Sequence, residues 1–247
     1  ANVEYFPSLA QLQRDVPSIY RLNCHQNKTE DEAIDCSFGN PSSDRLIVLV
    51  GDSVAAQWAP ALEKIATQGG FKLITITKAA CPYSRVKVKL SGRDYPSCMR
   101  WRDDMVAEIA QMKPAMIFAS QAGNYTDVSD ADMENGFRSI WRDFLATGAK
   151  LYVIESTPLL PSEPADCLAR NSAPCVYPRS EVAGSKALLT AARSVPAVDY
   201  IDMTDGICLK SFCSVIIGNV IAWRDSVHLS ATYAGLLSSY LKTAAGL

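Results

Sequence analysis

Residues 45–58 read RLIVLVGDSVAAQW, an apolar and largely β-branched run that ends in Gly-Asp-Ser at 51–53 and continues into alanine-rich sequence. A short β-branched run bounded by turn residues is typical of a fully buried strand in a parallel sheet. The Ala, Leu, Glu and Lys residues that follow favour a helix. The stretch therefore predicts a strand at 46–50, a tight turn, and a helix at 55–68.

Ser53 lies in this turn, where the expected strand gives way to the expected helix. Open α/β sheets bind their ligands at the carboxyl edge of the strands, and the N-terminus of the following helix offers free N–H groups to a developing anion. The position therefore suits a nucleophile. The alternative is a turn without chemistry, because glycine, aspartate and serine all favour turns for conformational reasons.

The other end of the chain supplies a base for such a nucleophile. The sequence holds two histidines, His25 and His228, and Asp225 stands three residues before the second. Side chains at i and i+3 of a turn share a face, so Asp225 can hold the His228 imidazole in one tautomer while its other nitrogen faces a serine. Ser53, His228 and Asp225 are therefore the candidate catalytic residues. We expect a surface or loop role for His25, which follows a cysteine.

The rest of the hydrophobic pattern alternates strands with helices. We expect further strands at 71–77, 115–120, 150–155 and 197–202, and further helices at 100–112, 130–147, 180–193 and 231–243. We also expect a Pro-rich loop at 158–178 and a small hairpin within 205–223. The connections between strands are long enough for crossovers that cover both faces of a parallel sheet.

The fold class expected from this alternation is α/β. Residues 45–247 would form one three-layer α/β/α sandwich around a five-stranded parallel sheet. Residues 1–44, which have mixed polarity, would form an N-terminal extension packed on that domain.

Composition narrows the classes of partner. The 247 residues are 48% hydrophobic and 20% charged, as in a globular protein that buries a sizeable core. A formal net charge of −2 without a basic run argues against nucleic acid or an anionic membrane surface as a partner. The sequence has no signal-peptide pattern and no apolar stretch of the ~18 residues that a membrane-spanning helix needs. Since it begins at Ala1 rather than Met, we interpret it as a mature or excised fragment.

Eight cysteines occur without a Cys-x-x-Cys pair, and neither histidine is suitably placed beside them, which disfavours a metal site. An even set of this kind indicates four disulfides and an oxidising compartment. About 105 pairings are possible. Because the cysteines fall into four local couples that each bracket a loop, we expect the pairs Cys24–Cys36, Cys81–Cys98, Cys167–Cys175 and Cys208–Cys213.

Several of these motifs together resemble a known family. Gly-Asp-Ser after the first strand, with Asp225-x-x-His228 before the last helix, resembles the SGNH (GDSL-like) hydrolases. The resemblance extends to one branch, the extracytoplasmic SGNH domain fused to membrane acyltransferases of the acyltransferase-3 type, which O-acetylate bacterial surface glycans. It covers the chain from about Cys24 onward. The segments that carry it are DSVAAQW at 52–58, TKAACP at 77–82, CMRWR at 98–102 and the stretch at 215–230, which includes WRDSVHLS.

The resemblance implies a flavodoxin-like strand order, 2-1-3-4-5, and donors for an oxyanion. One donor is the backbone N–H of Ser53. Another is the backbone N–H of Ala79 or Ala80, where the wider family usually has a glycine. Asp52, beside the nucleophile, is a further candidate oxyanion or substrate-binding residue.

The third implied donor is the side chain of Asn124. It stands where the family carries the asparagine of Gly-x-Asn-Asp, although Ala122 replaces the glycine and Tyr125 replaces the aspartate. An asparagine here also has a purely conformational explanation, because it tolerates left-handed backbone in turns.

By this resemblance the protein would be a serine-dependent O-acyltransferase that moves an acyl group, expected to be acetyl, to a bacterial surface glycan. Its acyl donor would come from a membrane acyltransferase module, it would need no cofactor, and it would work in the periplasm or another extracytoplasmic space. We expect the chain itself to be a soluble monomer. A carbohydrate acetylesterase of the same fold and a non-catalytic glycan-binding module remain alternatives, since water and a sugar hydroxyl can both attack an acyl-serine.

Overall fold

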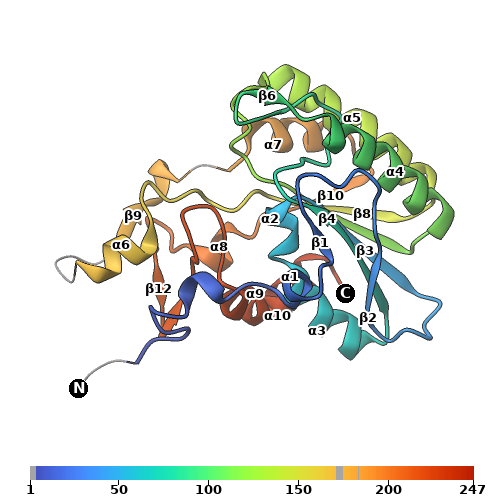
Figure 1. Ribbon diagram of the computed structural model, residues 1–247. Coiled ribbons are helices and arrows are strands. Elements are labelled where there is room, and N and C mark those ends of the chain that lie inside the picture. The colour runs from blue at the N-terminus through green and yellow to red at the C-terminus, as the bar shows by residue number, and fades with distance from the viewer. Residues whose placement is uncertain (1–3, 171–174, 183) are drawn as a thin grey trace.

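The computed structural model describes residues 4–170, 175–182 and 184–247. Its centre is a seven-stranded sheet with helices on both faces (Figure 1). Six strands follow the order β1-β4-β3-β7-β8-β10, and β2 also pairs with β4. The strands are β1 His25–Gln26, β2 Cys36–Gly39, β3 Leu46–Gly51, β4 Lys72–Lys78, β7 Met116–Ser120, β8 Lys150–Ile154 and β10 Val198–Ile201.

The five strands predicted from the sequence are β3, β4, β7, β8 and β10, and each is parallel to its neighbours among them. Their spatial order, β4-β3-β7-β8-β10, is the expected flavodoxin-like order. The α/β class and this topology are therefore confirmed. β3 lies inside the sheet, so the turn that follows it opens at the carboxyl edge between β4 and β7.

The sheet has seven strands rather than the expected five, because two short strands come from residues 25–39. β1 is parallel to β4 at its carboxyl end, and β2 is antiparallel to β4 nearer its beginning. These strands are two and four residues long and contain no apolar run, so periodicity gave no signal for them. The Cys24–Cys36 disulfide closes the segment that joins them.

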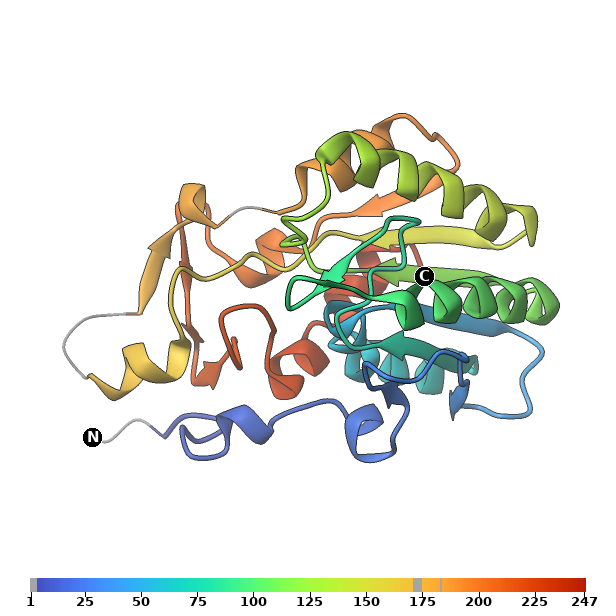
Figure 2. The same ribbon diagram turned by 45° about the horizontal axis from the view of Figure 1, so that its top comes forward.

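Helices cover the two faces of the sheet, which confirms the three-layer sandwich. Alternate β3 residues face opposite layers: Ile47 and Leu49 belong to one buried cluster, Val48 and Val50 to the other. Figure 2 shows α4 (Pro96–Met112) and α5 (Asp130–Ala146) lying side by side in the second layer, the one that packs on Val48 and Val50. The first layer contains α3 (Ala59–Gly69), α9 (Ala231–Leu236) and α10 (Ser238–Ala244), and the second contains α4 (Pro96–Met112), α5 (Asp130–Ala146) and α7 (Lys186–Arg193).

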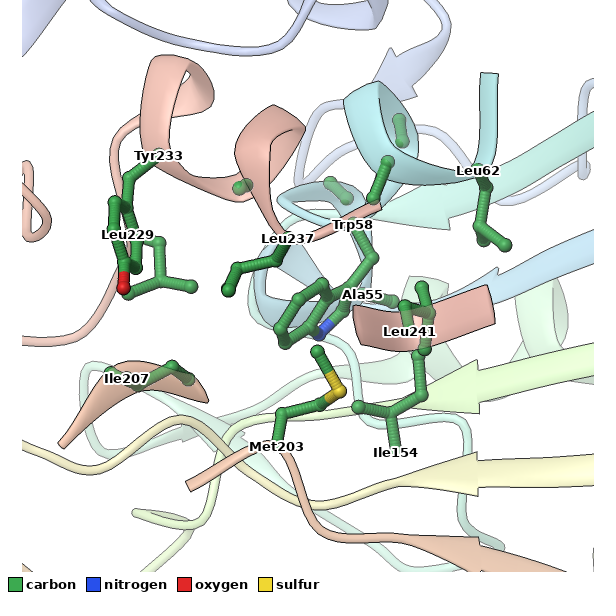
Figure 3. Packing of buried hydrophobic residues seen from close by; sticks show 14 of the residues in the cluster. Ala55, Trp58, Leu62, Ile154, Met203, Ile207, Leu229, Tyr233, Leu237 and Leu241 are labelled. Carbon is green, nitrogen blue, oxygen red and sulfur yellow. The ribbon is translucent and has the colours of Figure 1, made fainter. Parts of the chain in front are cut away.

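The helix predicted at 55–68 is interrupted. α2 (Ser53–Ala56) ends before Trp58, and α3 begins at Ala59 with Pro60 in its first turn. Proline lacks an N–H and its ring clashes with the carbonyl four residues earlier, so one continuous helix cannot pass through it. Trp58 is fully buried at the break and packs among the apolar side chains of Met203, Leu237 and Leu241 (Figure 3). The break therefore anchors the short helix α2 in the core.

Other predicted boundaries differ more modestly. The helix expected at 180–193 begins at Lys186, where Ser185 caps it by accepting a hydrogen bond from Leu188 N–H, and residue 183 lies outside the described residues. The last helix is divided into α9 and α10. The expected hairpin within 205–223 is present as β12 (Ile216–Ile217) and β13 (Val220–Ile221).

The loop predicted at 158–178 contains ordered elements on either side of residues 171–174, which lie outside the described residues. α6 (Pro164–Ala169) precedes that gap, and β9 (Val176–Pro178) pairs antiparallel with β11 (Phe212–Ser214). The four disulfides have the pairing expected from sequence, with Cα–Cα distances of 4.3 to 5.9 Å. Two of them, Cys167–Cys175 and Cys208–Cys213, tie down these peripheral loops.

Candidate active site

The turn after β3 brings Ser53 to the carboxyl edge of the sheet. Asp52 caps α2 by accepting a hydrogen bond from Val54 N–H at 2.8 Å. Gly51 has a φ of +143°, and a Cβ built on it would lie 1.9 Å from the carbonyl oxygen of Ser120 on β7. Glycine is therefore required for the turn to approach β7 this closely.

Three residues predicted from the sequence lie in one hydrogen-bonded row. His228 Nε2 is 2.8 Å from Ser53 Oγ. His228 Nδ1 is 2.8 Å from Asp225 Oδ1 and 2.9 Å from Oδ2. Ser53 and His228 are 175 residues apart in sequence, so only the fold joins them. These distances lie within the hydrogen-bond range that an activated serine nucleophile requires.

The Asp225 carboxylate is held from several sides. Its Oδ1 accepts hydrogen bonds from the N–H groups of Val227 at 2.9 Å and His228 at 2.7 Å, and its Oδ2 accepts one from Arg224 Nε at 3.2 Å. Burial raises the pKa of this carboxyl, but its hydrogen bond to His228 and the charges of His228 and Arg224 outweigh burial and hold the pKa well below its usual range. Asp225 is therefore an ionised acceptor for the imidazole.

A closed turn fixes Asp225 and His228 at this edge. Arg224 N–H donates to the carbonyl of His228 at 2.9 Å, and Trp223 forms an antiparallel bridge with Leu229. The turn is thus pinned by backbone pairing at its base. This explains how a loop can present two side chains in one orientation.

Gln57 is a buried link between the nucleophile turn and the histidine turn. Its Oε1 accepts a hydrogen bond from Leu229 N–H at 2.8 Å, and its Nε2 donates to Thr157 Oγ1. No role of its own is predicted for Gln57 from sequence, although it stands in the segment 52–58 that carries the family resemblance. A glutamine that spans two distant loops has no local sequence signal.

The expected oxyanion donor at Ala79 has a different role. Ala79 N–H donates to the carbonyl of Gln26 at 2.9 Å, continuing the β1–β4 pairing. Ala80 N–H has no acceptor among the residues that the structure describes, and Ala80 has a φ of +52°. In this turn, Ala80 N–H therefore remains unbonded within the described residues and Ala79 N–H does not, because the unpredicted strand β1 takes the latter.

Asp52 is fully buried, and its carboxylate is taken up by other groups of the protein. Its Oδ2 accepts hydrogen bonds from Ala122 N–H at 2.8 Å and from the Tyr125 hydroxyl at 2.6 Å. With the cap to Val54, three donors occupy the carboxylate. Burial raises its pKa, and these hydrogen bonds oppose that effect. Asp52 joins the turn after β3 to the loop after β7, so its assignment as an oxyanion or substrate-binding residue is corrected.

Asn124 lies in that loop after β7. Its side chain is exposed, and it bonds to no other side chain or backbone group in the described part of the chain. The loop opens at the same carboxyl edge as Ser53, because β7 is parallel to β3. The role of Asn124 as an oxyanion donor stays a prediction.

His25 belongs to the surroundings of the site rather than to an outer loop. Its Nδ1 is 2.9 Å from Thr77 Oγ1 on β4, and its ring centroid is 4.5 Å from that of Tyr20. Burial first, and then the charges of His228, Arg224 and Lys78, lower the pKa of His25 to about 4. The sequence alone missed this histidine as a neighbour of the site, since only the pairing of β1 with β4 brings it there.

Within residues 4–170, 175–182 and 184–247, no three or more His, Cys, Asp or Glu side chains gather in a way that could hold a metal ion. Among the helices of the same residues, none combines the length and the apolar character that crossing a membrane requires.

Sequence comparison identifies a family. The model of the family described as "SGNH domain (fused to AT3 domains)" matches residues 23–243. No curated protein matches the sequence significantly.

Solved structures are similar to this chain. The periplasmic domain of a lipopolysaccharide acetyltransferase from Salmonella ser. Paratyphi A is 15% identical, with a TM-score of 0.68 over 84% of this chain and 86% of that one. A GDSL-like lipase from Bacteroides thetaiotaomicron is 13% identical, with a TM-score of 0.49 over 84% of this chain and 91% of that one.

Proposed function

Because the chain belongs to the family of SGNH domains fused to AT3 domains, we propose that it moves an acyl group to a hydroxyl group of a bacterial surface glycan through an acyl-enzyme at Ser53. The observation that carries the proposal is the row in which Asp225, His228 and Ser53 are hydrogen-bonded in turn. A serine without such a base is a weak nucleophile at neutral pH, and this arrangement supplies the base and its orienting carboxylate.

In the first half of the reaction, Ser53 Oγ attacks the carbonyl carbon of a donor ester while its proton passes to His228 Nε2. The new Oγ–C bond gives a tetrahedral oxyanion. When the bond from carbon to the donor oxygen breaks, His228 returns the proton to that leaving oxygen, and the acyl group remains as an ester on Ser53. The Asp225 carboxylate stabilises the imidazolium between the two proton transfers.

In the second half, His228 removes the proton of an acceptor hydroxyl, whose oxygen attacks the acyl-serine. The Oγ–C bond then breaks and Ser53 recovers its proton. The donors that we assign to the oxyanion in both halves are the N–H groups of Ser53 and Ala80 and the side-chain amide of Asn124. Ser53 N–H and Ala80 N–H make no hydrogen bond within the described residues, which leaves both free for a ligand.

The acyl group in this proposal is acetyl, and the donor is supplied by an AT3 membrane module of the kind to which the family is fused. The Salmonella domain, whose title names a periplasmic lipopolysaccharide acetyltransferase, supports a glycan acceptor and an extracytoplasmic location. The four disulfides support an oxidising compartment independently, because such bonds rarely persist in a reducing cytosol.

Hydrolysis is the second candidate, favoured by the partial exposure of Ser53, which gives water access to an acyl-serine. A carbohydrate acetylesterase would use the same row of residues and differ only in the acceptor. A glycan-binding module without catalysis would need none of the three side chains in hydrogen-bond contact.

The test is the release of p-nitrophenol from p-nitrophenyl acetate by the wild-type chain, by Ser53→Ala and by His228→Ala, with intact mass read during turnover. We expect an added acetyl group on the wild type and on neither variant. Equal release by all three chains, without acetylation, would contradict a serine mechanism.

A second measurement separates transfer from hydrolysis. Adding an oligosaccharide acceptor to the acetylated enzyme should shorten the lifetime of the acetyl-serine and give an acetylated sugar. A lifetime that no acceptor changes, with free acetate as the only product, would identify an esterase instead.

A further inference from the structure

Arg224 is a nearly buried cation beside the catalytic row. Its side chain is 9% exposed, and its Nε donates to Asp225 Oδ2 at 3.2 Å. Its Nη1 is buried without a hydrogen-bond partner among the described residues. A buried guanidinium normally has its donors satisfied, so the orphaned Nη1 calls for a physical explanation.

The ring of Tyr20 lies beside this guanidinium. The guanidinium carbon of Arg224 lies 5.8 Å from the centroid of that ring, within cation–π range. The electron-rich face of an aromatic ring attracts a cation and can offset a missing hydrogen-bond acceptor. Burial raises the pKa of the Tyr20 hydroxyl, and the nearby charge of Arg224 opposes that rise. Tyr20 and Arg224 thus form a pair although they are far apart in sequence.

Contacts away from the catalytic row hold Tyr20 in place. The residue lies in α1 (Ser18–Arg21), whose Ser18 hydroxyl donates to Glu63 Oε1 of α3 at 3.0 Å. The Tyr20 ring also packs against the ring of His25, with 4.5 Å between the ring centroids. His25 Nδ1 is in turn 2.9 Å from Thr77 Oγ1 on β4. Tyr20 is therefore positioned by the sheet and by α3.

The two oxygens of Asp225 are held unequally. Oδ1 accepts from two backbone N–H groups, of Val227 and His228, as well as from the imidazole. Oδ2 accepts only from the imidazole and from Arg224 in the described part of the chain. The rotation of the carboxylate about its Cβ–Cγ bond therefore depends on Arg224, and the tautomer of His228 depends on that carboxylate.

We propose that Tyr20 and Arg224 are positioning residues for the reaction, and that the N-terminal segment thereby becomes part of the catalytic device. The line of contacts runs from Tyr20 to Arg224 and on to the Asp225 carboxylate that orients His228. This inference rests on the proposed function, in which His228 is the general base. Neither residue touches substrate; both act through Asp225.

The first test follows acetylation of Ser53 from p-nitrophenyl acetate in Tyr20→Leu, Arg224→Gln and the double variant. Each single change should lower kcat roughly tenfold with KM unchanged, because orientation of the base is lost while substrate contacts remain. The double variant should be no slower than Arg224→Gln. Tyr20→Phe, which keeps the ring face, should restore most of the rate lost in Tyr20→Leu. Tyr5→Leu, an exposed tyrosine of the same segment, is the matched control and should leave the rate unchanged.

The second test does not depend on activity. The protein has two histidines, so the Nδ1–H resonance of His228 can be identified as the one that His228→Ala removes, and it can be followed by NMR with His25 in place. Tyr20→Leu and Arg224→Gln should shift or broaden that resonance, and Tyr5→Leu should not. An unchanged resonance in both, or multiplicative rate losses in the double variant, would overturn the positioning role. If the wild type never becomes acetylated at Ser53 but the two variants still shift the His228 resonance, the proposed function alone would be contradicted.

Discussion

The Tyr125 hydroxyl donates to Asp52 Oδ2 at 2.6 Å, which ties the loop after β7 to the turn that carries the nucleophile. The family pattern has an aspartate at this position, so here a tyrosine reaches back to the buried carboxylate beside Ser53. The loop that carries Asn124 is therefore held relative to Ser53 by a hydrogen bond between buried side chains.

Tyr125→Phe removes this hydroxyl and little else. We expect the free energy of unfolding to fall by roughly 1–3 kcal/mol, the range for a buried hydrogen-bonding group left without its partner. Urea unfolding measures the loss. Tyr240→Phe, at an exposed tyrosine of α10, should change the stability far less. Equal free energies of unfolding for the two variants would mean that the Tyr125–Asp52 hydrogen bond does not stabilise the fold.

Gly51→Ala tests the approach of the nucleophile turn to β7. The added Cβ would lie 1.9 Å from the Ser120 carbonyl oxygen and 2.8 Å from the Ala55 Cβ, at a φ of +143° that L residues avoid. Both the backbone and the turn would have to move, so we expect a loss of roughly 3–5 kcal/mol, or failure to fold.

The control for that loss is Gly148→Ala. Gly148 also has positive φ, +85°, but a Cβ there meets nothing within 4 Å. Gly148→Ala should lower the free energy of unfolding by only about 1–2 kcal/mol, which is the cost of left-handed backbone alone. Similar unfolding midpoints for the two variants would show that the turn can relax away from β7.

The strands of the core could be predicted because each is a buried apolar run with turn residues at its ends. Leu46–Gly51 is the clearest case, since hydrophobic burial alone specifies it. β1 could not be predicted in this way. It consists of His25 and Gln26, and it forms only because β4 offers a free edge and a disulfide holds the segment there.

The hydrogen-bonded row of Asp225, His228 and Ser53 could be predicted for a similar reason. Asp225 and His228 are close in sequence, and their spacing on a turn is itself the signal. Arg224 and Tyr20 gave no such signal, because their contact spans the whole chain and a cation–π pair has no sequence spacing. The assignment of Ala79 N–H as an oxyanion donor failed because strand β1 could not be predicted. Gln26 of that strand accepts the hydrogen bond from Ala79 N–H.

Asp225→Asn tests the orienting carboxylate directly. An asparagine keeps the shape, but its NH2 group can donate to His228 Nδ1 and so favour the wrong imidazole tautomer. We therefore expect kcat to fall by roughly 10⁴-fold while the protein stays folded. The rate of acetyl-serine formation measures the effect. Asp199→Asn, at an exposed carboxylate paired with Lys150, is the control and should change the rate little. If Asp225→Asn lowers the rate of acetyl-serine formation only slightly, the Asp225 carboxylate does not orient the base.

His25 makes the stability of the protein depend on pH. An unfolded histidine binds a proton near pH 6.5, whereas burial lowers the pKa of folded His25 to about 4. Between these values the unfolded chain binds more protons, so stability is fully present above pH 6.5 and declines as the pH falls towards 4. In the folded chain, a proton on His25 would also add a charge close to Arg224 and His228.

His25→Gln should flatten this decline, because a neutral amide can still bond to Thr77 but gains no charge. Urea midpoints at pH 7.5, 6.5, 5.5 and 4.5 measure the difference between the two chains. Carboxylates that titrate at the lower end contribute equally to both, so subtracting one curve from the other isolates His25. The wild type should lose stability relative to the variant as the pH falls, and parallel curves would show that His25 accepts a proton as readily in the folded chain as in the unfolded one.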